Sequence, residues 1–172
     1  NTKVTKGSSV TISTTDVIKS EKFGGSVSVQ NNSVLTHDLE IGGSLSASSL
    51  DLNGFSLTTG NTCSIAYATV NGGSLYVGGS MTGSRLIMTN PEDYVCVVGA
   101  FTMGGTLNNT GYLTAGTLEL RGDFTQNYNY SNFVASDDHT TILSGKTTVT
   151  NRNYVQKIKF NYPELNHFNH VI

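Results

Sequence analysis

The chain has few charged residues. Lys, Arg, Asp and Glu make up 13% of its 172 residues, with a formal net charge of −2, whereas about 25% is usual. The ten Lys and Arg residues are scattered and form no basic stripe. This excludes an electrostatic nucleic-acid binder and a polybasic membrane-surface helix. Ser, Thr, Asn and Gly must supply the polar surface.

Helical patterns and long apolar runs are also missing. The sequence has six Ala and no apolar series at helical spacing, while 19 Gly and many Thr and Val favour short strands broken by turns. No stretch of about 18 apolar residues occurs, so no segment is expected to insert into a membrane. The sequence therefore predicts an all-β protein.

Cysteine is limited to Cys63 and Cys96, which fit no metal-ligand spacing. No metal site and no cofactor is predicted. Cys63 and Cys96 are separated by about one and a half turns of the coil inferred below. That half-coil offset favours two free thiols over a disulfide.

A twelve-position repeat is the most informative pattern. Val70–Met81 recurs 43 residues later as Leu113–Phe124, and both read apolar, x, small, Gly, Ser/Thr, Leu, x, apolar, x, Gly, x, apolar. The apolar positions and turn glycines keep their character, while the outward residues change. This is typical of a scaffold coil rather than of a ligand-binding glycine loop.

A shorter form of the repeat, apolar-x-apolar-x-Gly-x-apolar, occurs throughout the chain. Its copies begin at Leu39, Leu75, Val95 and Leu118, and a looser copy spans Leu50–Phe55. The glycines at 54, 79, 99 and 122 lie about 20–25 residues apart, the length of one coil of a parallel β-helix.

In such a coil, short strands place alternate apolar side chains inward, and coils about 4.8 Å apart bury Leu over Leu. We predict one domain, residues 1–172, folded as a parallel β-helix with irregular coils, right-handed because parallel crossovers usually are. An antiparallel sandwich with hairpins at Asn53-Gly54 and Asn71-Gly72 is the competing interpretation. It does not explain the twelve-position repeat. A loop is predicted at Asn127–Ser136, and further strands at Thr141–Leu143 and Val155–Phe160.

Several segments resemble repeat regions of large surface proteins of Gram-positive bacteria. The similarity rests on Arg85–Val95, Tyr112–Gln126, Thr141–Lys146 and Phe168–Ile172 and covers roughly residues 39–172. It implies an extracellular β-solenoid segment of an adhesin-like, multidomain protein, and it supplies no catalytic residue. We expect a structural or adhesive spacer or display segment, with host or cell-wall glycans or surface proteins as partners.

Two groups are candidate binding residues. Tyr112, Tyr128 and Tyr130, together with Phe133, could stack sugars or cover the side or end of the solenoid. The cluster Asp137-Asp138-His139 would need more oxygen ligands to hold a cation, and a solvated turn is the favoured interpretation.

Two other motifs are explained by the repeat and by strand geometry, without a binding role. Arg121-Gly-Asp123 is an integrin-type tripeptide, but it lies inside the repeat, where outward residues vary. His167 and His170 lie three apart, which on a strand places them on opposite faces and argues against a shared metal.

The alternative function is a glycan-binding or glycan-degrading β-helix domain of the pectate-lyase type. Catalysis would need clustered carboxylates, as a Ca²⁺ site or an acid/base pair. The outward acidic residues are Glu40, Asp51, Glu119 and Asp123. Tyr76 and Cys96 occupy the slots equivalent to Glu119, so no continuous acidic row is expected and no catalytic residue is assigned.

Overall fold

The computed structural model describes residues 10–12, 22–145 and 154–172, and all regular elements in these ranges are β-strands. Parallel pairing joins them into two sheets of eight strands, with successive strands alternating between the sheets. The described part of the chain contains no helix with the length and hydrophobicity of a bilayer crossing. The predicted parallel β-helix is confirmed.

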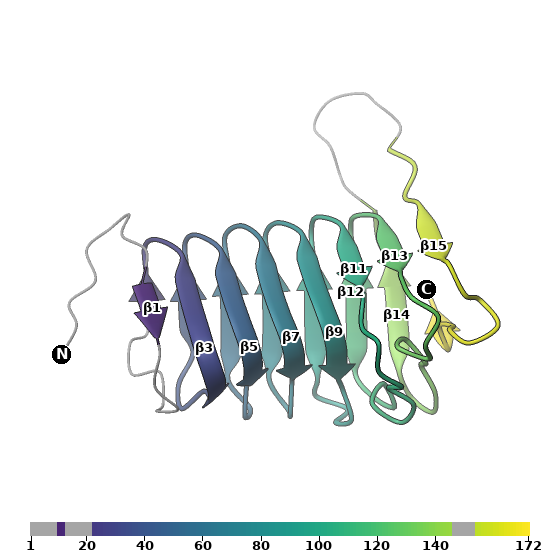
Figure 1. Ribbon diagram of the computed structural model, residues 1–172, viewed down its shortest axis with the longest axis horizontal. Helices are drawn as coiled ribbons and strands as arrows, with labels where there is room; N and C mark the ends of the chain where they lie inside the picture. The colour runs from purple at the N-terminus through teal and green to yellow at the C-terminus, as the bar shows by residue number, and fades with distance from the viewer. Residues whose placement is uncertain (1–9, 13–21, 146–153) are drawn as a thin grey trace.

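The odd-strand sheet is the near sheet in Figure 1, and the even-strand sheet lies behind it. The odd-strand sheet contains β1 (Val10–Ile12), β3 (Val27–Val34), β5 (Leu45–Asp51), β7 (Cys63–Thr69), β9 (Met81–Ile87), β11 (Phe101–Met103), β13 (Phe124–Gln126) and β15 (Ile158–Phe160). The even-strand sheet contains β2 (Lys22–Phe23), β4 (Leu39–Ile41), β6 (Ser56–Thr59), β8 (Ser74–Val77), β10 (Tyr94–Val97), β12 (Thr117–Leu120), β14 (Thr140–Leu143) and β16 (His170–Val171). Near strands run down and far strands run up as the chain advances to the right, which makes the coil right-handed (Figure 1).

The register of pairing gives the length of each coil. Val27, Leu45, Cys63 and Met81 pair in succession, and equivalent residues of these coils are 18 positions apart. The following coils take 20, 23 and 34 residues. The prediction of 20–25 residues is therefore right for two later coils and too long for the first ones.

The register also corrects one copy of the short repeat. Gly79 lies against Asn61 of the previous coil, so Gly54 is not its equivalent. Leu50–Phe55 instead forms the end of β5 and the corner after it. The 43-residue repeat is two coils, because Leu75 pairs with Val95 and Val95 with Leu118.

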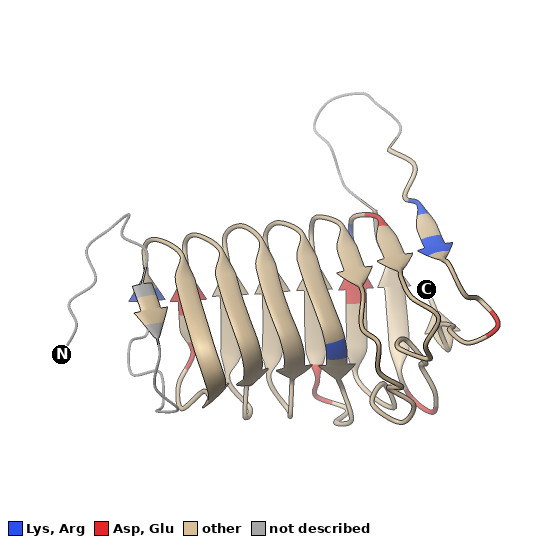
Figure 2. Cartoon of the chain, in the orientation of Figure 1, with Lys and Arg blue, Asp and Glu red and all other residues tan. Residues whose placement is uncertain are grey.

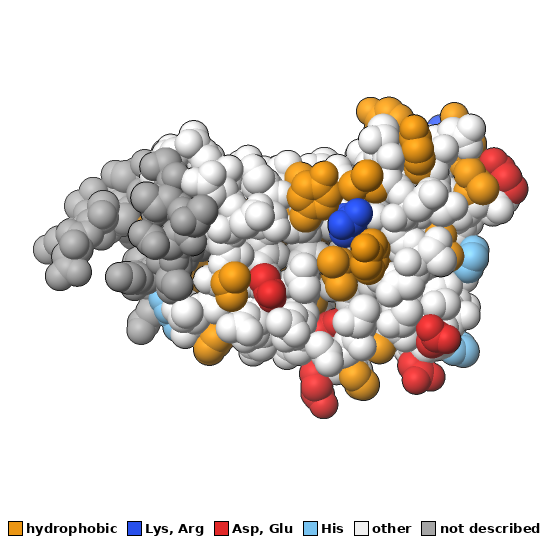
Figure 3. All heavy atoms as spheres, turned by 60° about the horizontal axis from the view of Figure 1, so that its bottom comes forward, with side chains coloured by type: hydrophobic (Ala, Val, Ile, Leu, Met, Phe, Trp, Pro, Cys, Tyr) orange, Lys and Arg blue, Asp and Glu red, His pale blue; other side chains and the backbone are white. Residues whose placement is uncertain are grey.

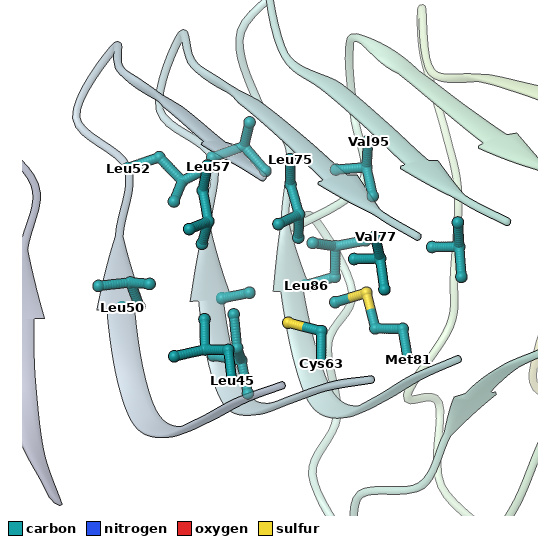
Figure 4. Close-up of a cluster of buried hydrophobic side chains, with 14 of the residues drawn as sticks. Leu45, Leu50, Leu52, Leu57, Cys63, Leu75, Val77, Met81, Leu86 and Val95 are labelled. Carbon is teal, nitrogen blue, oxygen red and sulfur yellow. The ribbon is translucent and has the colours of Figure 1, made fainter. Parts of the chain in front are cut away.

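Inward side chains form continuous ladders, as predicted. One ladder follows the even-strand sheet and another the odd-strand sheet (Figure 4). Their members are Leu39, Leu57, Leu75, Val95 and Leu118, and Val27, Leu45, Cys63, Met81, Phe101 and Phe124, all buried. Burying each large apolar side chain contributes about 1.5–3 kcal/mol. This packing can form only when several coils are stacked.

Two tight turns contain the Asn-Gly pairs that the sandwich interpretation would use for hairpins. Asn53 and Asn71 have φ of 49° and 51°, and the following glycines have φ of 82° and 81°. Each turn connects a strand of one sheet to a strand of the other, so neither is a hairpin. The antiparallel alternative, which used these pairs as hairpin turns, is therefore wrong.

Aromatic rings fill the core at the C-terminal end. Phe124 lies 5.6 Å from Phe101 and 4.9 Å from Phe133, measured between ring centroids, and Phe160 and Phe168 complete the cluster. Residues 127–133 form the predicted loop, but isolated bridges at Val134 and Ala135 return it to the stack. The strand predicted at Val155–Phe160 is shorter and begins only at Ile158.

Deleting residues 45–62 should preserve the fold, because it removes one 18-residue coil and places Val27 under Cys63 and Leu39 under Leu75. We expect a β-sheet circular dichroism spectrum and cooperative thermal unfolding. Deleting residues 54–62 instead removes β6 alone and moves β7 to the wrong sheet, so cooperative unfolding should be lost. Equal stability of the two deletions would contradict the assigned register.

Candidate functional site

A shallow groove of about 580 Å³ runs along the outer face of the odd-strand sheet. Its floor contains a row of hydroxyl side chains that share one register position on successive strands: Ser28, Ser46, Ser64, Thr82 and Thr102. Asn127 and Tyr128 also line it. None of the described residues that line it is Asp, Glu, Lys, Arg or His. The groove is therefore polar, uncharged and extended across several coils.

Several hydroxyls of this row are available to a ligand. Thr82 Oγ1 donates to Ser64 Oγ at 3.1 Å. The hydroxyls of Ser28, Ser46 and Thr102 make no hydrogen bond with any described residue. Each can both donate and accept, which suits a partner that is itself rich in hydroxyls.

Tyr128 lines the groove as the chain leaves β13. Its ring lies over Gly104, where an added Cβ would be 3.5 Å from the ring carbon Cε2. Its backbone is left-handed, with φ of 71°, which costs about 1–3 kcal/mol for a non-glycine residue. Gln126 Nε2 supports this conformation by donating to the carbonyls of Asn127 and Tyr128, both at 2.9 Å. The ring is held in place and is still 55% exposed.

A ladder of buried amides organises the loops around the groove. Asn132 Nδ2 donates to the carbonyls of Gly105 and Asn127, both at 2.8 Å. Asn109 and Asn166 repeat this role on either side, with Asn109 Nδ2 donating to Asn132 O at 3.0 Å and Asn166 Oδ1 accepting from Phe133 N at 2.8 Å. The sequence contained this signal only as an Asn–Asn spacing equal to the coil length, and sequence reasoning missed it.

The three candidate tyrosines do not form one platform. Tyr128 lines the groove, while Tyr130 is exposed but does not. Tyr112 packs on Arg85, whose guanidinium carbon lies 4.8 Å from the ring centroid. Sequence reasoning did not single out Arg85 or Tyr67, because their proximity to Tyr112 depends on the coil register.

The Asp137-Asp138-His139 cluster is divided between solvent and interior. Asp137 and Asp138 are exposed in a turn, and Asp137 has a φ of 52°. His139 is fully buried; its Nδ1 lies 3.0 Å from Ala115 O, and its Nε2 has no hydrogen-bond partner among the described residues. Burial lowers the pKa of His139. No group of three His, Cys, Asp or Glu side chains in the described ranges is arranged to hold a metal ion.

The other acidic residues are dispersed. Thr58, Tyr76 and Cys96 separate Glu40 from Glu119 in the same outward row, which confirms that no acidic row forms. A second hollow of about 660 Å³ is lined by His37, Asp38, Leu39, Glu40, Ser56 and Thr58. Its carboxylates are engaged, because Glu40 pairs with Lys22 at 2.7 Å and Asp38 accepts from Ser56 N at 2.8 Å.

A polar cluster around Glu119 lies on the outer face of the even-strand sheet. Glu119 accepts from Arg121 Nε at 2.7 Å, from Tyr94 at 2.5 Å and from Ser144 at 2.8 Å. These bonds, chiefly that from Arg121, lower the pKa of Glu119 to about 2 despite its partial burial. Such a carboxylate is a poor proton acceptor at neutral pH.

Both cysteines are buried and free, as predicted. Cys63 faces the core from β7, and burial raises its pKa to about 12. Cys96 faces outward from β10 beside the Glu119 cluster, and burial, followed by the charge of Glu119, raises its pKa as well. Neither thiol has the lowered pKa that a reactive nucleophile requires.

The Arg121-Gly122-Asp123 tripeptide is integrated into the coil. Arg121 pairs with Glu119, and Asp123 Oδ1 accepts from Tyr154 at 2.5 Å and from Lys157 N at 2.9 Å. A Cβ at Gly122 would collide with the backbone oxygen of Gly99. His167 and His170 are exposed and lie on separate segments, with a bridge at His167 and a strand at His170.

Comparisons of the chain with protein-family models, with curated proteins and with solved structures find no match. The two outer faces of the solenoid differ in character. One face carries an open, uncharged groove, and the other carries charged groups that are bonded to one another.

His139 should make stability depend on pH. Its folded-state pKa lies below the ordinary value of 6.5, so the unfolded chain takes up a proton first as pH falls. The contribution of neutral His139 to the free energy of unfolding is complete above about pH 6.5. Below that pH the free energy of unfolding falls, by at most about 1.4 kcal/mol per pH unit.

Urea unfolding of wild type and His139→Gln at pH 8, 6.5 and 5 measures this effect. We expect a flatter pH profile for His139→Gln than for wild type. Identical profiles for wild type and His139→Gln would show that His139 is not the titrating group.

Proposed function

We propose that this chain is a structural and adhesive segment of a bacterial cell-surface protein, and that its groove binds an extended, hydroxyl-rich glycan without cleaving it. The observation that carries the proposal is the groove itself. Its floor repeats the same hydroxyl position from coil to coil, its lining residues carry no charge, and an exposed tyrosine ring lies along it.

This combination suits a sugar polymer. Sugar hydroxyls donate and accept hydrogen bonds as Ser and Thr do, and the apolar face of a sugar ring packs on an aromatic ring. A groove built from stacked coils presents equivalent groups about 4.8 Å apart. A polymer of repeating units therefore meets a repeating surface.

The remainder of the chain supports a spacer role. The inward ladders are apolar from coil to coil, whereas the outward positions vary in residue type. Such a stack is lengthened or shortened by whole coils without change to its core. We infer that the segment holds its groove at a defined place in a longer surface protein.

Binding is favoured over the glycan-degrading alternative by the position of the carboxylates. A lyase or hydrolase needs acidic or basic groups that converge on the bound sugar. Among the described residues no such group lines the groove, and Glu119, whose pKa is lowered, lies on the other sheet with three donors.

Retention of the protein in gels containing neutral or acidic polysaccharides tests this proposal. Tyr128→Asn removes the ring but keeps a residue that tolerates a left-handed backbone, and it should weaken binding about 2- to 10-fold, as expected for one lost stacking contact. Tyr130→Asn, at an exposed site outside the groove, is the matched control. Equal retention of both variants, absence of retention, or release of shorter sugars would overturn the proposal.

A further inference from the structure

Arg85 lies between two tyrosine rings on the outer face of the odd-strand sheet. Its guanidinium carbon is 5.4 Å from the ring centroid of Tyr67 and 4.8 Å from that of Tyr112. Tyr67 pairs with Arg85 across β7 and β9, and its side chain is 41% exposed. We call these three residues the Arg85 patch.

The guanidinium is held in one orientation by a buried amide. Arg85 Nε donates to Asn109 Oδ1 at 3.1 Å. Asn109 is only 1% exposed, and its Nδ2 donates to Ser84 O at 2.9 Å and to Asn132 O at 3.0 Å. With both amide donors committed to backbone carbonyls, the side-chain oxygen is directed at Arg85. The buried amide ladder thus positions an arginine at the surface.

The charge of Arg85 is not neutralised by the residues around it. The ion pairs within the described ranges are Lys22–Glu40 and Arg121–Glu119, and Arg85 is in neither. Its two terminal nitrogens make no hydrogen bond with a described residue. Arg121 is the useful contrast, because its guanidinium is paired with a carboxylate 2.7 Å away. A planar, preorganised cation with unused donors matches a carboxylate ligand.

The patch lies at the edge of the groove. Ala66 and Ser84 line the groove, and Tyr67 and Arg85 follow them directly in β7 and β9. The blue segment of β9 in Figure 2 is the position of its one cationic residue. On the face drawn in Figure 3, a blue cationic patch is bordered by orange side chains. A glycan in the groove would pass beside a cation flanked by aromatic rings.

We propose that the Arg85 patch binds the carboxylate of an acidic sugar, so that the glycan recognised by the groove contains uronic acid residues. This rests on the proposed glycan-binding function and specifies its substrate class. The terminal nitrogens of Arg85 donate to the two carboxylate oxygens, and Tyr67, the more open ring, packs against the sugar. Asn109 is a positioning residue that acts through Arg85.

Two matched probes separate charge recognition from sugar recognition: an oligogalacturonate and its fully methyl-esterified, neutral form. Isothermal titration at low salt should show wild type binding the acid about tenfold or more tightly than the ester, as expected for a charge-assisted, two-point hydrogen bond. Arg85→Gln should reduce this ratio to about one, and raised salt should reduce it in wild type.

Lys159→Gln is the matched control, because it removes one positive charge from the exposed face of β15 on the same sheet. It should leave the acid-to-ester ratio unchanged. Thermal unfolding of both variants checks that Arg85→Gln is folded. Loss of the contacts between Arg85 and its two tyrosine rings would by itself lower the stability and leave the acid-to-ester ratio unchanged.

The outcomes distinguish this inference from the function it rests on. Equal binding of acid and ester by wild type, with weaker binding of both by Tyr128→Asn, would overturn the role of Arg85 and leave the groove intact. The same acid-to-ester ratio in Arg85→Gln and Lys159→Gln would also overturn it. Failure of wild type to bind either probe or any neutral polysaccharide would overturn both proposals.

Discussion

The parallel register between coils is the constraint on which the rest of the structure depends. Each strand forms its backbone hydrogen bonds with the coil before it and the coil after it, so the same position recurs as a line of residues along the solenoid. An inward line must be apolar at nearly every step, as in Leu39, Leu57 and Leu75. An outward line has no such requirement, and it is where a binding surface can develop without cost to the core.

The outer faces of the two sheets carry different kinds of side chain. On the even-strand sheet, Glu119 bonds to Tyr94, Arg121 and Ser144, so the charged groups satisfy one another. On the odd-strand sheet, small hydroxyls leave a groove. The coils lengthen after β9, and the added residues form loops that the buried Asn109, Asn132 and Asn166 secure. These loops bring Tyr128 and Tyr112 to the groove and its edge.

The sequence predicted the strand content, the parallel stack, the inward Leu ladder and the two free thiols. It did not predict the 18-residue coils: Asn61 interrupts the row of Gly43 and Gly79, and the neighbouring row of Gly42, Gly60 and Gly78, which does have an 18-residue spacing, was overlooked. It grouped His139 with two aspartates, although the chain turns at Asp137 and buries only the imidazole. The Arg85 patch depends on two unequal coil steps, 18 residues from Tyr67 to Arg85 and 25 residues from Met88 to Leu113, so its members could be brought together only once the register was known.

A pair of engineered cysteines tests the register most directly. In a background with Cys63 and Cys96 replaced, Ser46→Cys with Ser64→Cys places two outward thiols on adjacent strands, since these residues are Cα partners. Parallel neighbours about 4.8 Å apart fall within the range of about 4.4–6.8 Å for Cα atoms joined by a disulfide. Ser46→Cys with Thr58→Cys places the thiols on opposite outer faces of the same coil. The register predicts that mild oxidation joins the first pair and not the second; a cross-link in the second pair, or in neither, would contradict it.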